Sequence, residues 1–152
     1  MVIAVGAGLL AGGVARADNH LATCSVRMID ALHEPGGVDP RITVLRPYLE
    51  QPPFTAWKSF RLVEEKTFTI AHETTEKFAL PNGSQASLTF VEHMLRPDGK
   101  HRLRLRLEIE KRAQKVLDTT FVLDEGGVVL QAGQKHGKGL LVLGFSCAIP
   151  NG

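Results

Sequence analysis

Six histidines and two cysteines carry the widest range of chemistry in this sequence of 152 residues. No two histidines stand four residues apart, as metal-binding pairs on a helix do, and neither cysteine has a CxxC partner. Across a hairpin, however, His93 and His101 could meet. With Glu92 or Glu73 nearby, that pair would form a metal site. We expect instead partly exposed histidines that bind no metal, and we assign no cofactor. The six histidines are His20, His33, His72, His93, His101 and His136.

The two cysteines, Cys24 and Cys147, lie near opposite ends of the chain. They predict either a disulfide that joins the first strand to the last or a pair of buried free thiols, because sequence does not give the distance between them. A third interpretation rests on residues 21–24, Leu-Ala-Thr-Cys, which resemble a lipoprotein cleavage site and would leave a lipid on Cys24. Thr23 and the polar residues at 18–20 argue against that third interpretation.

Motifs for nucleophilic or phosphate chemistry are absent from the sequence. There is no G-x-S-x-G sequence for a serine nucleophile. The glycines at 6–12 have the wrong spacing for a dinucleotide fingerprint, and the glycine-rich residues 133–139 lack two required positions of a phosphate loop. We therefore interpret 133–139 as a hairpin loop with solvated lysines, and we expect that the protein is not an enzyme.

A row of basic side chains is the one surface feature that suggests a ligand. These residues alternate along an extended stretch, so they fall on one face of it. Without acidic partners they would attract phosphate or sulfate groups of an anionic envelope polymer, a lipid or an envelope protein. The alternative is an ordinary solvated sheet face with paired charges, which Glu92 on the facing strand favours. The basic stripe consists of Lys100, Arg102, Arg104 and Arg106.

The element that positions this stripe is a long hairpin between residues 86 and 124. From 101 to 109, apolar residues alternate with charged ones, which is the pattern of a half-buried strand. Residues 96–100, Arg-Pro-Asp-Gly-Lys, supply a proline with a preset φ and a glycine that is free to turn. We therefore expect residues 88–95 to fold back as the antiparallel partner.

Alternation and turn residues predict the remaining elements. Asp39-Pro40 is typical of a helix start, and the apolar spacing that follows predicts one short helix that ends at Gln51. The last strand, 140–149, lacks polar alternation and should be buried on both faces. Seven or eight strands at short spacing predict a mainly β fold, an antiparallel sandwich or partly closed barrel with one short N-terminal helix. Further strands are expected at 20–34, 57–71 with a bulge near 64–65, 74–80, 116–124 and 128–132.

Composition and the N-terminal residues bear on the compartment. The net charge of +2 is too small to indicate nucleic-acid binding, and 43% hydrophobic and 22% charged residues are ordinary for one globular domain. Residues 1–17 contain an apolar run that ends in Ala-Arg-Ala, which is typical of a secretory signal peptide and too short to span a membrane. We therefore expect a cleaved leader at 1–17, one β-rich domain at 18–152, and a periplasmic or extracellular protein.

Five stretches follow one another in the order strand, turn, strand and glycine turn. They are Leu80-Pro81-Asn82-Gly83, Leu88-Thr89-Phe90-Val91, Pro97-Asp98-Gly99-Lys100, Leu103-Arg104-Leu105-Arg106-Leu107, and Thr119-Thr120-Phe121-Val122-Leu123-Asp124-Glu125-Gly126-Gly127 with Val128-Val129-Leu130-Gln131-Ala132-Gly133. This order resembles the C-terminal β-domain of bacterial secretins, which form outer-membrane secretion pores. The resemblance implies an envelope protein and assigns no functional residue, because the ring-forming domains that precede the secretin β-domain are missing. The chain is also similar to small uncharacterised exported proteins of Gram-negative bacteria.

These features predict an exported, non-enzymatic β-domain that binds or packs against another cell-envelope component. The alternative is a small-ligand-binding or hydrolytic β-barrel protein with its site in the sheet interior. A deep pocket where His72, His93 or Glu92 converge would favour the alternative. A filled core with an exposed edge strand would favour association.

Overall fold

Strands make up most of the chain that the computed structural model describes, residues 20–150. The expected signal peptide at 1–17 lies outside the described residues. In chain order the elements are β1 (Leu21–Leu32), β2 (Gly37–Val38), η1 (Pro40–Leu45), α2 (Arg46–Leu49), η2 (Phe54–Ala56), β3 (Ser59–Ala71), β4 (Thr75–Ala79), β5 (Gln85–Leu95), β6 (His101–Lys111), β7 (Gln114–Asp124), β8 (Val129–His136) and β9 (Gly139–Ala148).

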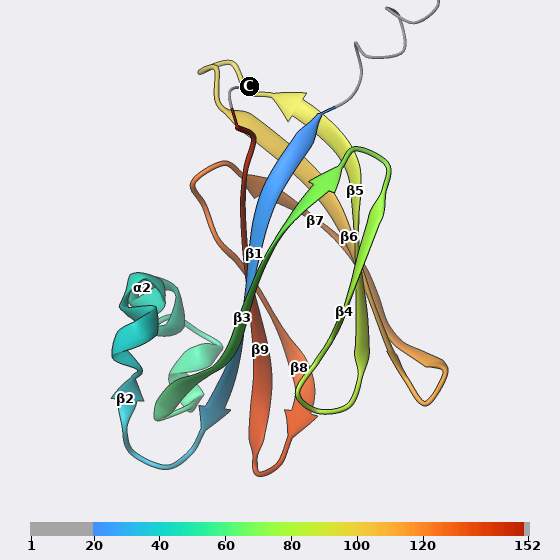
Figure 1. Ribbon diagram of the computed structural model, residues 1–152. Coiled ribbons are helices and arrows are strands. Elements are labelled where there is room, and N and C mark those ends of the chain that lie inside the picture. Colours follow the sequence, from blue (N-terminus) through green and yellow to red (C-terminus); the bar gives the residue numbers. More distant parts are fainter. Residues whose placement is uncertain (1–19, 151–152) are drawn as a thin grey trace, which may run out of the picture.

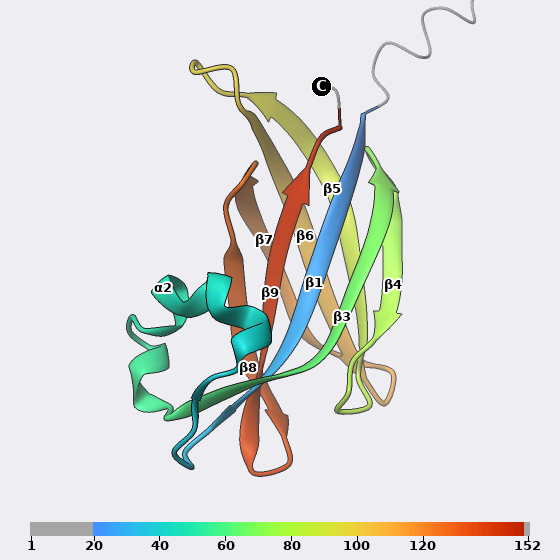
Figure 2. The ribbon, with the colours of Figure 1, turned by 60° about the vertical axis from the view of Figure 1, so that its left-hand side comes forward.

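The strands form two sheets that face each other as a β-sandwich (Figures 1 and 2). The first sheet has the order β2-β3-β1-β9-β8, and the second has the order β4-β5-β6-β7. Neighbouring strands are antiparallel, except that β2 pairs parallel with β3. The expected sandwich is therefore confirmed, with nine described strands in place of seven or eight. The two-residue β2 is too short to produce an alternating pattern in the sequence.

The long hairpin is also confirmed. β5 and β6 pair antiparallel around a turn in which Gly99 has a φ of 87°. Leu103 and Leu105 of β6 face the interior and expose no surface. β6 and β7 are joined through Arg112 and Ala113, which both have positive φ. Tight turns of this kind normally use Asn or Gly, so the sequence carries no signal for this one.

A bulge in β5 redirects the end of that strand. The pairing with β6 skips Val91, which lies between Phe90 and Glu92 as an extra residue. Because side chains alternate with a period of two, one extra residue moves every later side chain to the opposite face. His93 therefore points into the sandwich, whereas a regular strand with Phe90 in the core would turn it outward.

The interior between the sheets is filled by apolar side chains. Phe90 and Phe145, from opposite sheets, are fully buried, and Phe121 of β7 packs on Phe145 with ring centroids 5.4 Å apart. Burial of this kind is the dominant favourable contribution to folding. The rest of this cluster includes Ala22, Cys24, Val26, Met28, Ile70, Leu88, Leu103, Leu105, Leu107, Ile109, Leu141 and Leu143.

A helical segment covers part of the outer face of the first sheet (Figure 1). Ile42, Leu45 and Leu49 are buried there in a second cluster that includes Val142 of β9. This cover explains why β9 is buried on both faces, as predicted. The expected single helix is divided into the 3-10 turn η1 and the four-residue α2. Within η1, Ile42 has a non-helical φ of −126°, so this part of the segment is itself kinked.

The prediction of a loop at 133–139 is wrong for most of these residues. β8 continues to His136, and only Gly137 and Lys138 form the turn to β9. Gly133 has a φ of 125° and lies at a register shift in β8. A glycine accepts this conformation without a Cβ clash, so it bends the strand and does not end it.

Candidate functional site

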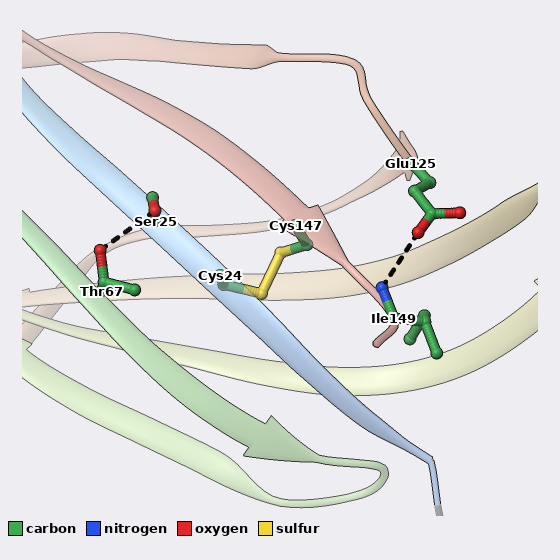
Figure 3. Close-up of a disulfide and its surroundings, with 6 residues drawn as sticks. All are labelled: Cys24, Ser25, Thr67, Glu125, Cys147 and Ile149. Atoms are coloured by element: carbon green, nitrogen blue, oxygen red, sulfur yellow. Dashed lines mark hydrogen bonds between the residues drawn. A yellow bond between two sulfur atoms is a disulfide. The ribbon is translucent and has the colours of Figure 1, made fainter. Parts of the chain in front are cut away.

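A buried disulfide joins β1 to β9 (Figure 3). Cys24 lies directly opposite Cys147 in the strand pairing, with the two Sγ atoms 2.04 Å apart. Cys24 is fully buried, and Cys147 is 4% exposed. The disulfide predicted as one alternative is therefore confirmed. Neither cysteine is a free thiol in this structure, and a Cys24 sulfur bonded in this way is not available to carry a lipid.

Polar contacts flank the disulfide on both sides (Figure 3). The hydroxyl groups of Ser25 and Thr67 are 3.2 Å apart and connect β1 to β3. The backbone N–H of Ile149 donates to the Glu125 carboxylate at 3.3 Å, which holds the chain after β9 against the turn after β7. The disulfide is therefore part of a region where four segments of the chain are connected.

Four histidines meet at one end of the sandwich, and we call them the histidine layer. His20 precedes β1 and His72 follows β3, and the His72 N–H donates to the His20 carbonyl at 2.9 Å. His93 and His101 come from β5 and β6 of the other sheet. All four side chains are half-buried. The predicted approach of His93 to His101 is confirmed, and the layer also contains the two histidines of the first sheet.

Direct contacts link the rings of the histidine layer. His93 Nε2 and His101 Nδ1 are 2.7 Å apart, a hydrogen-bond distance. The ring of His20 stacks on that of His93 with centroids 4.0 Å apart. His72 Nε2 lies 3.1 Å from the Val91 carbonyl, and its ring meets the edge of Phe90. Burial, followed by the nearby charges of His20, His101 and His72, lowers the pKa of His93 below its usual range.

The geometry of the layer differs from that of a metal centre. Among residues 20–150, no group of three or more His, Cys, Asp or Glu side chains is arranged to hold a metal ion. The stacked rings of His20 and His93 do not converge on one point, and Glu92 forms an ion pair with Arg104. A surface depression of about 280 Å³ is nevertheless lined by His20, His72, Glu73, Glu92 and His93.

Sequence reasoning missed His20 and His72 as members of the layer. The signal that could have found them is their position two residues from core residues, Ala22 in β1 and Ile70 in β3. Extending each strand by two residues places both histidines on the inward face. Whether these inward residues meet depends on the pairing of β1 with β3, which alternation within either segment does not specify.

The basic stripe lies on the outer face of the second sheet, where acids stand beside its arginines. Arg102 Nε is 2.6 Å from Asp124 Oδ1, and Arg106 Nη2 is 2.7 Å from Asp118 Oδ2. Arg104 pairs with Glu92, and the backbone N–H of Lys100 donates to Asp98 in the turn. The hydrogen bond from Arg106 lowers the pKa of Asp118 to about 2. Anion binding by this stripe stays a prediction.

β7 is a free edge of the second sheet. It pairs with β6 on one side and with no described strand on the other. The Glu125 N–H donates to the His101 carbonyl at 2.9 Å, and hydrogen-bonded pairs alternate along an antiparallel ladder. By this alternation Thr119 donates its N–H to β6, whereas the N–H groups of Thr120 and Val122 point away from the sheet.

Within residues 20–150, no helix has the length and apolar character needed to cross a bilayer. No family model, curated protein or solved structure matches the chain. The resemblance to secretins therefore stays a prediction.

Proposed function

We propose that this protein is an exported, non-enzymatic β-sandwich that binds another cell-envelope component through the free edge of β7. The disulfide supports the compartment, because such bonds persist in oxidising environments and are rare in the cytosol. The secretin-like order of strands and turns belongs to the same proposal of an envelope protein.

The free edge of β7 is the observation that carries the proposal. An unpaired row of N–H and C=O groups is a template for another extended chain. Residues 119–123, Thr-Thr-Phe-Val-Leu, have high β propensity and no charge. By contrast, the unpaired part of β3 carries Glu64, Glu65 and Lys66, and charges on an edge discourage pairing.

The filled interior supports a role in association. Apolar side chains of both sheets occupy the space in which a barrel protein would hold a ligand. A ligand-binding or hydrolytic protein is the second candidate, and the depression beside the histidine layer is the observation that favours it. This depression is bounded by five side chains at one end of the sandwich and does not extend into the apolar core.

Site-specific photo-crosslinking in a secreting Gram-negative host tests the proposal. The crosslinking residue replaces Val122 at the β7 edge or, as the matched control, the exposed Val44 of η1. We expect one discrete adduct from position 122, none from position 44, and loss of the adduct when Thr120→Pro removes an outward N–H. The intact mass of the purified protein should correspond to a chain that begins near Asp18. Reduction of the disulfide should increase this mass by that of two hydrogen atoms.

Three results would contradict the proposal. An adduct that survives Thr120→Pro would mean that edge pairing is not the mode of binding. Equal crosslinking from positions 122 and 44 would indicate nonspecific contact. An intact mass that corresponds to the uncleaved chain with two free thiols would contradict a location in the cell envelope.

A further inference from the structure

The histidine layer joins the two sheets at one end of the sandwich by contacts that depend on protonation. His20 belongs to the first sheet, and its ring lies on that of His93 from the second sheet. His93 in turn contacts His101 on the neighbouring strand at 2.7 Å. No part of the proposed edge interaction at β7 uses these residues.

Neutral imidazoles suit this arrangement, and imidazolium ions do not. A hydrogen bond between His93 Nε2 and His101 Nδ1 needs one nitrogen to donate and the other to accept. When both rings are protonated, both nitrogens carry hydrogens and the bond is lost. The stacked rings of His20 and His93 would then also bring like charges to a centroid separation of 4.0 Å.

Few charges near the layer would offset this repulsion. Glu73 is the acid that would most directly stabilise a protonated His72, since both line the same depression. Glu92 lines it too, but its carboxylate is paired with Arg104. The charged groups at this end of the β5–β6 hairpin are Arg96, Asp98, Lys100 and Arg102. Next to them, Asp124 is paired with Arg96 and Arg102, and Glu125 accepts the Ile149 N–H.

We propose that the histidine layer is a proton-sensitive contact, which holds this end of the sandwich closed at neutral pH and opens it under mildly acidic conditions. Opening separates the ends of β1 and β3 from the β5–β6 hairpin, while the disulfide keeps β1 attached to β9.

The direction of the pH effect follows from the proton balance. The pKa of His93 is lower in the folded protein than in the unfolded chain, so the unfolded chain binds more protons in the window between the two values. The contribution of His93 to the free energy of unfolding is complete above its pKa in the unfolded chain, about 6.5. It decreases as the pH falls toward the lower pKa of His93 in the folded protein.

Hydrogen exchange of individual amides tests the proposal, at about pH 7.5 and about pH 5.5 on either side of the ordinary histidine pKa. The reporters are the N–H groups of Glu73, bonded to the Phe90 carbonyl at 2.7 Å, and of Phe90, bonded to the Thr74 carbonyl at 3.1 Å, because these bonds join the chain after β3 to β5. Gly37, whose N–H is bonded to Lys58, is the reference amide outside the layer. We expect the protection factors of both reporters to fall several-fold at the lower pH and that of Gly37 to stay constant.

Two variants assign the effect to the layer, with EDTA present to remove metal ions. His93→Gln takes away the central imidazole and should leave the reporters nearly independent of pH. His33→Gln removes a histidine that stacks on Trp57 outside the layer, so this variant should behave like the wild type. Equal pH dependence in His93→Gln and wild type would overturn the proposal.

An NMR titration of the wild-type imidazoles keeps the test independent of whether His93→Gln folds. We expect His93 to titrate below about 6.5 and its curve to be coupled to that of His20 or His101. An independent titration of His93 at or above about 6.5 would also overturn the proposal.

Discussion

The direction in which single side chains point determines the chemistry of each face of this protein. On β6, Leu103 and Leu105 enter the core, whereas Arg102 and Arg106 reach acids on the outer face. On β5, the extra residue at the bulge turns His93 inward. The core, the basic stripe and the histidine layer therefore arise from one rule, the alternation of side chains along a strand.

Leu105 at the centre of β6 is a sensitive test of this alternation. It is fully buried, so Leu105→Ala should lower the free energy of unfolding by about 2 to 5 kcal/mol through lost burial and the cavity that remains. Urea denaturation measures the change. Val122→Ala, at a side chain 41% exposed on the outer face of β7, is the control and should cost less than about 1 kcal/mol. Similar losses in the two variants would contradict the assigned face.

At the scale of elements, β7 has two edges with different roles. One edge is bonded to β6, and the other presents free N–H groups at Thr120 and Val122. The β6–β7 turn has left-handed residues at Arg112 and Ala113 although neither is a glycine. Pairing of long strands therefore determines this turn, because the bonds on each side outweigh the cost of an unfavourable φ.

Two neighbouring threonines distinguish the edges of β7. Thr119→Pro should lower the free energy of unfolding by about 1 to 3 kcal/mol more than Thr120→Pro does. The reason is that Thr119→Pro removes the N–H that donates to the Leu107 carbonyl of β6. The two variants introduce the same residue one position apart and are compared by urea denaturation. Equal destabilisation would mean that the alternation of hydrogen bonds along β7 is assigned incorrectly.

At the scale of the whole molecule, two kinds of link connect distant parts of the chain. The disulfide joins residues 123 positions apart and secures the first sheet. The histidine layer joins the two sheets only four residues before Cys24, so the covalent bond and the proton-sensitive contact act on the same end of β1. The covalent link limits how far that end can separate.

Removal of the disulfide should weaken the whole fold. The double variant Cys24→Ala/Cys147→Ala is expected to lose about 2 to 5 kcal/mol of unfolding free energy, because a long closed loop restricts the unfolded chain. Urea denaturation with and without reductant measures this loss. Reductant should destabilise the wild type and leave the double variant unchanged. A wild type unaffected by complete reduction would contradict a stabilising role.

Much of the fold could be predicted from local signals in the sequence. The β5–β6 hairpin follows from alternation around Pro97-Asp98-Gly99, and the Asp39 cap is confirmed because its carboxylate accepts the Arg41 N–H. The division of the helix and the continuation of β8 through Gly133 were not predicted. Both depend on packing and strand pairing that override local residue preferences.

By itself, the sequence determined most strands and turns, the inward face of a regular strand such as β6, and the closeness of His93 to His101, because these depend on neighbours along the chain or across one short hairpin. Only the tertiary structure decided that Cys24 lies opposite Cys147, that acids meet the arginines, and that His20 and His72 complete the layer. These features depend on the register of strands distant in sequence, and one bulge such as that at Val91 reverses a face.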